Sequence, residues 1–134
     1  MKHIRINLLI IFIIILYAFI IEPFSLQKNY LNITIPNLNE NIKIVHITDL
    51  HMYKYIFFHD KIINKLKEEN PDLIFYTGDS IIKNTDKNSL NLFFEKLSKI
   101  APIYTVYGNW DYYNINMVNE VIRNFELMDL SHYS

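Results

Sequence analysis

Three apolar runs rich in β-branched residues recur along the chain after residue 41. They cover residues 42–48, 73–77 and 103–107. Runs of this length with little alternation are typical of strands that are covered on both faces, as in parallel sheets. The pattern therefore predicts three buried strands.

The segments between and after these runs show helical spacing of their apolar residues. Apolar positions recur at intervals of three or four over residues 60–69, 90–100 and 118–125, and Ser89 or Asn88 is the predicted N-cap of the second helix. A strand-helix order repeated three times predicts parallel strands joined by helical crossovers. The predicted fold class is therefore α/β.

The N-terminal region follows a different pattern. An apolar run over residues 8–21 follows two basic residues, Lys2 and Arg5. Extended to residues 4–24, a helix at ~1.5 Å per residue reaches about 30 Å, the thickness of the hydrocarbon core of a bilayer. Residues 1–24 are therefore predicted to form an N-terminal transmembrane helix that acts as a membrane anchor.

A buried core helix and a cleaved signal peptide are the alternatives to this anchor. A helix that is apolar on every face and has basic flanks is untypical of the core of a small domain. No small-residue cleavage site follows the apolar run, which favours an uncleaved anchor. The basic residues before the run predict a cytoplasmic N-terminus and a folded domain on the outer face of the cell membrane. Membrane lipid is thus an expected partner of this segment.

A polar, Asn-rich stretch covers residues 25–41. Within it, apolar and polar residues alternate from Leu31 to Ile35 before Pro36, a pattern typical of an edge strand. The sequence therefore predicts a linker that carries one edge strand, followed by a folded domain over residues 42–134.

Composition and charge limit the possible partners. The 134-residue chain has 13 basic and 14 acidic residues and a formal net charge of −1, so no nucleic-acid partner is expected. It contains no cysteine, which excludes disulfides, thiolate catalysis and cysteine-ligated zinc.

A polar cluster follows each predicted strand. The clusters are Asp49-Leu50-His51, Gly78-Asp79 and Gly108-Asn109-Trp110-Asp111. Successive clusters lie 30 residues apart, counted from Asp49 to Asp79 and from Asp79 to Asn109. Because parallel strands bring their carboxyl ends to one edge of the sheet, all three clusters are expected to meet there. Both glycines of the chain lie in these clusters and predict a tight turn or a close approach of two backbones.

The clusters contain candidate ligands for divalent cations. Asp49 and His51, two positions apart on a segment expected to be extended, would point the same way and bind one cation. Asp79 would bridge to a second cation, and Asn109 would supply a carbonyl oxygen. This mixed oxygen and nitrogen set suits Mn²⁺, Fe or Zn²⁺. Two such ions about 3.5–4 Å apart form the clamp used for displacement at phosphorus.

With their order and spacing, the three clusters resemble the first three motifs of calcineurin-like metallophosphoesterases, D-x-H, G-D and G-N-H-D/E. The similarity covers about residues 41–114. Residues 42–48 and the predicted anchor resemble the bacterial membrane-associated branch related to UDP-2,3-diacylglucosamine hydrolases. The resemblance implies an α/β sandwich preceded here by the anchor.

The same resemblance implies roles for single residues. Asp49 and His51 would bind one metal, Asp79 would bridge, and Asn109 would bind the other. Asp111 is expected to orient neighbouring groups in the second shell rather than to bind a metal.

Two features depart from the family pattern. Trp110 stands where the family has a histidine thought to protonate the leaving group or bind phosphate, and an indole N–H is no acid near neutrality. His59 is a weak candidate for that role, because it is rather expected to cap a helix. Family members also have later histidines, including a G-H-x-H segment, whereas after Asn109 this sequence has only His132. Residues 42–134 are therefore predicted to be the N-terminal half of the sandwich, with an incomplete site for two divalent metal ions.

Three functions follow as alternatives. The first is a metal-dependent phosphoesterase that hydrolyses phosphomonoesters or phosphodiesters, lipid-linked ones among them. The second is a catalytically inactive, truncated, membrane-tethered module that binds metal weakly or pairs with a partner chain. The third is a membrane-tethered α/β binding module without a metal.

Overall fold

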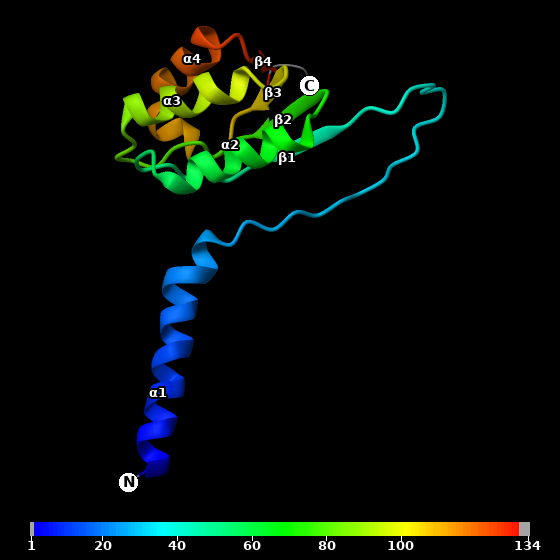
Figure 1. The fold of residues 1–134 in the computed structure, drawn as a ribbon. Coiled ribbons are helices and arrows are strands. Elements are labelled where there is room, and N and C mark those ends of the chain that lie inside the picture. Colours follow the sequence, from blue (N-terminus) through cyan, green and yellow to red (C-terminus); the bar gives the residue numbers. More distant parts are fainter. Residues whose placement is uncertain (1, 132–134) are drawn as a thin grey trace. The chain divides into compact units, whose positions relative to one another are not determined.

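The computed structural model describes residues 2–131, and the chain divides into two units, Met1–Pro36 and Asn37–Ser134. The second unit contains a four-stranded sheet (Figure 1). Its strands are β1 (Ile44–Ile47), β2 (Leu73–Thr77), β3 (Ile103–Val106) and β4 (Met128–Asp129). They lie in the order β1-β2-β3-β4, and every neighbouring pair is parallel. The three predicted strands and the α/β class are confirmed.

Helices connect the strands, as the periodicity predicts. They are α2 (Phe57–Glu69), α3 (Lys87–Ser98) and α4 (Ile115–Asn124), and the short 3-10 helix η3 (Asp111–Asn114) precedes α4. The predicted N-cap of the second helix is wrong, because α3 begins two residues earlier than Ser89. The carboxylate of Asp86 caps it by accepting a hydrogen bond of 2.8 Å from the Ser89 amide.

The core lies between the helices and one face of the sheet. On this face Ile74, Tyr76 and Ile103 are at most 2% exposed, and α3 adds Phe93 and Leu97, both 0% exposed. Residues of the opposite face are not covered to the same degree: Ile44 is 44%, Phe75 38% and Met128 39% exposed. The long apolar runs predict strands covered on both faces, whereas the structure covers one face.

The first unit contains the apolar N-terminal segment. Its α-helix, α1 (Lys2–Leu16), has 15 residues and is followed by a π-helical turn η1 (Tyr17–Ile21) and a 3-10 turn η2 (Glu22–Phe24). At ~1.5 Å per residue α1 spans about 22 Å, short of the ~30 Å of a hydrocarbon core. Among residues 2–131, no helix combines the length and the apolar character that crossing a membrane requires. The predicted transmembrane helix is thus not supported.

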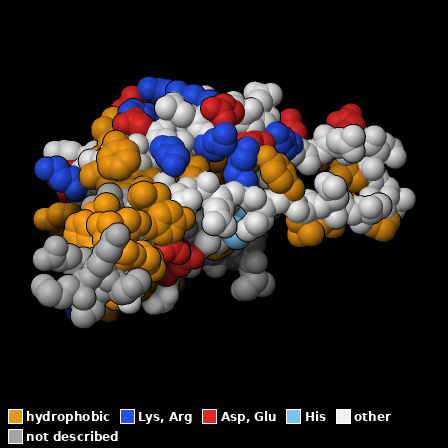
Figure 2. All heavy atoms as spheres, turned by 60° about the horizontal axis from the view of Figure 1, so that its bottom comes forward, with side chains coloured by type: hydrophobic (Ala, Val, Ile, Leu, Met, Phe, Trp, Pro, Cys, Tyr) orange, Lys and Arg blue, Asp and Glu red, His pale blue; other side chains and the backbone are white. Residues whose placement is uncertain are grey.

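Large apolar side chains of this unit are exposed. From Leu8 to Leu16 each is at least 42% exposed, and hydrophobic side chains at the surface are orange in Figure 2.

The linker forms no strand between residues 25 and 41, so the predicted edge strand is wrong. Leu31, Ile33 and Ile35 are 81%, 72% and 55% exposed. Alternation alone does not make a strand, because an unpaired strand leaves its backbone groups to water and gains no ladder hydrogen bonds.

The core supports a prediction about stability. Phe93→Ala removes a fully buried ring that lies 5.6 Å from Phe94 and 5.9 Å from His59, measured between ring centroids. We expect the free energy of unfolding to fall by about 3–5 kcal/mol in urea titrations of the full chain. The control is Leu92→Ala on the same helix, where the side chain is 38% exposed and the expected loss is below about 1 kcal/mol. Equal losses in the two variants would contradict this assignment of the core.

Candidate metal site

The loops after β1 and β2 run side by side at the carboxyl edge of the sheet. The amides of Asp49, His51 and Met52 donate hydrogen bonds to the carbonyl oxygens of Gly78, Asp79 and Ser80, at 3.3, 2.9 and 3.0 Å. This backbone pairing continues the parallel register beyond the ends of the strands. It fixes the first two polar clusters against each other.

The backbone at these clusters is left-handed rather than extended. The φ angles of Asp49, His51 and Asp79 are 54°, 40° and 54°. The expectation of an extended segment after β1 is therefore wrong. Such φ values are uncommon outside glycine, and they are found preferentially where surrounding contacts impose them.

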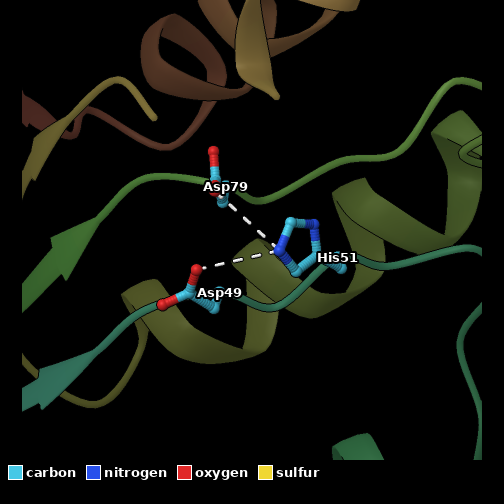
Figure 3. Close-up of side chains that lie close together, drawn as sticks. All are labelled: Asp49, His51 and Asp79. Carbon is cyan, nitrogen blue, oxygen red and sulfur yellow. Dashed lines mark ion pairs between the residues drawn. The ribbon is translucent and has the colours of Figure 1, made fainter. Parts of the chain in front are cut away.

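The left-handed turns bring three side chains together (Figure 3). His51 Nε2 lies 3.7 Å from Asp49 Oδ1 and 3.8 Å from Asp79 Oδ2. One ligand atom from each residue falls within 4.8 Å of the others. The side chain of Asp49 is 59% exposed, that of His51 36% and that of Asp79 13%. This group, the Asp-His-Asp cluster, is open to solvent on the Asp49 side.

Two carboxylates and an imidazole are hard and borderline ligands. Their ligand types and spacing fit a divalent cation, which the two carboxylates and the imidazole nitrogen would coordinate. The three residues therefore fit the metal use that the sequence predicts.

The two glycines explain how the second and third clusters approach. Gly78 has a φ of 76°, and a Cβ there would overlap the backbone of Gly108. A Cβ on Gly108 would overlap the backbone and carboxylate of Asp79. Both predicted reasons for glycine are present, because Gly78 needs a positive φ and the pair needs a close approach of two backbones.

Asp111 holds this approach from inside the protein. It is 1% exposed, and its Oδ2 accepts hydrogen bonds of 2.9 Å from the amides of Asp79 and Gly108. Its Oδ1 accepts hydrogen bonds from the amide and the hydroxyl of Ser80. Asp111 thus ties the loop after β3 to the loop after β2 and contacts the Asp-His-Asp cluster through the backbone amide of Asp79.

The loop after β3 also supports Asp79 directly. The Trp110 amide donates a hydrogen bond of 2.8 Å to Asp79 Oδ1, while Oδ2 is the oxygen that faces His51. Asn109 lies between Gly108 and Trp110, and its side chain is exposed. The structure therefore brings the loop that carries Asn109 to Asp79.

Trp110 and His59, the two residues considered for the role of proton donor, have different surroundings. The Trp110 ring lies edge-on to His51, with centroids 5.3 Å apart. His59 is 7% exposed and accepts a hydrogen bond of 3.0 Å at Nδ1 from the Ile56 amide, so it closes the first turn of α2. Burial lowers the pKa of His59, and the helix-cap interpretation is therefore favoured over a proton donor. His132 lies outside the described residues.

Thr48 is a contributor that the sequence analysis did not identify. Its hydroxyl lies 2.8 Å from Asp49 Oδ2 and 3.1 Å from the Thr77 carbonyl oxygen. It thereby restrains the most exposed carboxylate of the cluster. The available signal was its position, as the polar residue that closes an apolar strand just before Asp49.

Fold and site together define an α/β protein with a candidate metal centre at the carboxyl edge of a parallel sheet. The sequence profile of the family described as calcineurin-like phosphoesterase matches residues 42–132, and the chain belongs to this family. The match covers all three clusters.

Two curated proteins are similar to this chain. It is 30% identical over 133 residues to the uncharacterized metallophosphoesterase Cj0846 of Campylobacter jejuni. The aligned region covers 94% of this chain and 35% of that protein. It is also 28% identical over 76 residues to the uncharacterized metallophosphoesterase YkoQ of Bacillus subtilis, and that aligned region covers 54% of this chain and 28% of that protein. The chain thus spans about a third of the length of these relatives.

The Asp111 network generates a prediction that separates shape from charge. Asp111→Asn keeps the volume and replaces one accepting oxygen with a donor that faces N–H groups, so two accepted hydrogen bonds are lost. We expect a loss of at least about 2 kcal/mol in the free energy of unfolding. Chemical denaturation of the full chain measures it.

The control is Asp86→Asn. Both hydrogen bonds that this cap accepts from Ser89 go to one oxygen, which asparagine retains. Its stability should change by less than about 0.5 kcal/mol. A stable Asp111→Asn variant would show that the buried carboxylate does not hold the loops.

Proposed function

We propose that this chain carries the metal-binding strand ends of a phosphoesterase that hydrolyses phosphomonoesters or phosphodiesters. The observation that carries the proposal is the Asp-His-Asp cluster, assembled at the carboxyl edge of the sheet in a member of the calcineurin-like phosphoesterase family. Both relatives are named metallophosphoesterases.

The proposed cofactors are two divalent ions, drawn from Mn²⁺, Fe and Zn²⁺. Asp49 and His51 would hold one ion, Asp79 would lie between the two, and Asn109 would bind the second. Bound ions would supply charge for the phosphate oxygens and lower the pKa of a water molecule. The chain's own residues supply the geometry: Asp111 fixes the backbone of Asp79, and the Trp110 amide fixes its carboxylate.

The leaving group has no assigned proton donor. Trp110 can donate a hydrogen bond but cannot act as an acid near neutral pH. His59 is buried at the start of α2 with Nδ1 engaged. Esters with good leaving groups are therefore the proposed substrates.

A second candidate is a half domain that needs further polypeptide. The uncovered face of the sheet supports it, because Ile44, Phe75 and Met128 are each at least 38% exposed on that face. We propose that a longer chain or a partner covers this face and supplies the later histidines that the family resemblance implies. The relatives are about three times as long as the matched region, which is consistent with this candidate.

The N-terminal unit is proposed to contact membrane lipid, with the folded unit on the outer side. Support comes from the exposed apolar side chains between Leu8 and Leu16. The outer position of the folded unit is proposed from Lys2 and Arg5, the basic residues that precede the apolar run. On the same ground, this chain is proposed to belong to the membrane-associated branch of the family.

Metal binding is the first test. Mn²⁺ titrated into the full chain should bind weakly, because the cluster is open on one side, and Asp79→Asn should weaken binding at least about tenfold. Free Mn²⁺ can be followed by electron paramagnetic resonance. Asp72→Asn is the control, because Asp72 lies before β2, at the opposite end of that strand from Asp79, and accepts a hydrogen bond from the Lys43 amide. Equal binding by both variants would exclude the cluster as the site.

Hydrolysis of an activated aryl phosphodiester with Mn²⁺ is the second test. We expect little turnover by the 134-residue chain, and recovery when a C-terminal segment with a G-H-x-H motif is fused to it. Asp79→Asn should abolish the recovered activity. Robust turnover by the unextended chain that Asp79→Asn removes would keep the phosphoesterase and overturn the half-domain candidate.

A further inference from the structure

Aromatic side chains that the core does not use lie beside the Asp-His-Asp cluster. Trp110 is half-buried and Tyr113 is 55% exposed, and neither belongs to the hydrophobic core. Together with Lys83 they form a series of contacting side chains, here called the aromatic wall. Core packing does not account for it.

Trp110 connects the wall to the cluster through two contacts. Its ring meets His51 edge to face, at 5.3 Å between centroids and an interplanar angle of 83°. Its amide donates a hydrogen bond to Asp79 Oδ1. Trp110 is therefore held by both loops that supply the cluster, through its ring by the loop after β1 and through its backbone amide by the loop after β2.

Tyr113 extends the wall away from the cluster. Its ring centroid lies 5.1 Å from that of Trp110, with the planes tilted by 50°. The Tyr113 amide donates a hydrogen bond of 3.0 Å to the Trp110 carbonyl oxygen within η3. The two rings are thus placed by a backbone turn rather than by flexible loops.

Lys83 adds a positive charge from another loop. It lies in the segment after β2, is exposed, and its Nζ lies 5.0 Å from the centroid of the Tyr113 ring. A cation over an aromatic face is attracted by the ring quadrupole, which holds the ammonium close to the ring. The wall therefore offers two rings and one ammonium group.

We propose that the aromatic wall is a specificity-determining subsite that binds the apolar organic group of a phosphate ester, with a preference for aryl over small alkyl groups. The proposal rests on the proposed function, in which the phosphate lies at the Asp-His-Asp cluster. Trp110 and Tyr113 contact the organic group, and the Lys83 ammonium over the Tyr113 ring lies at the end of the wall away from the cluster. The tryptophan that removes the usual acid thereby adds a binding surface.

The test uses Trp110 as its own probe, because it is the only tryptophan of the chain. Its fluorescence is followed while the full chain is titrated with phenyl phosphate and with methyl phosphate, in the presence and absence of Mn²⁺. We expect phenyl phosphate to bind about threefold or more tightly than methyl phosphate, because one additional aromatic contact contributes a binding free energy of that size. Tyr113→Ala should bring the affinity ratio close to one, whereas Tyr113→Phe should keep it.

The matched control is Tyr112→Ala. Tyr112 is the neighbouring residue of the same type in η3, is 67% exposed, and has its ring beside Tyr107 instead of Trp110. Its replacement should leave the ratio unchanged. Equal affinities in the unmodified chain, or a ratio that falls equally in the two variants, would overturn the wall. The affinity ratio of phenyl phosphate to methyl phosphate tests the aromatic wall, both with and without Mn²⁺. The proposed function is tested separately: Mn²⁺ should strengthen binding of both ligands, and Asp79→Asn should remove that gain.

Discussion

One buried carboxylate holds the candidate site together. Asp111 accepts backbone hydrogen bonds from Asp79, Ser80 and Gly108, and it does so at 1% exposure. A buried charge is costly unless donors surround it, and here backbone amides from two loops do so. Because three of its four donors are backbone amides and the fourth is the Ser80 hydroxyl, the carboxylate mainly fixes the path of the two loops.

This constraint explains why the site tolerates an unfavourable backbone. Asp49, His51 and Asp79 all have positive φ angles, which cost of order 1–3 kcal/mol each in residues other than glycine. The paired loops and the Asp111 network hold these residues in place. The geometry of the cluster is therefore set by contacts within the protein.

The sequence predicted the parts of the fold that depend on periodicity. The strands predicted over residues 42–48, 73–77 and 103–107 are present as β1, β2 and β3. The regular interval between the polar clusters also predicted that Asp49, His51 and Asp79 meet at one edge of the sheet. What it could not predict depends on contacts distant in sequence. β4 has two residues and forms only because Tyr104 and Thr105 pair with it. The alternating segment around Ile33 forms no strand, because no neighbouring strand pairs with it.

Conformation within the site was also beyond the sequence pattern. Alternation suggested that Asp49 and His51 share a direction on an extended segment, but left-handed turns bring them together. Those turns follow from hydrogen bonds to the loop after β2, which no local pattern encodes. In contrast, the two glycines were informative because a backbone contact leaves no room for any other residue.

The parallel order of the strands also has a consequence for folding kinetics. Each neighbouring strand is reached only through a helical crossover, so loop-closure entropy is lost before the pairing compensates for it. Asp49, His51 and Asp79 are in the chain before β3, but the carboxylate that fixes the backbone of Asp79 comes after it, at residue 111. A nascent chain that has paired β1 with β2 therefore holds the ligands without their final geometry. A cation would stabilise the finished fold rather than nucleate it.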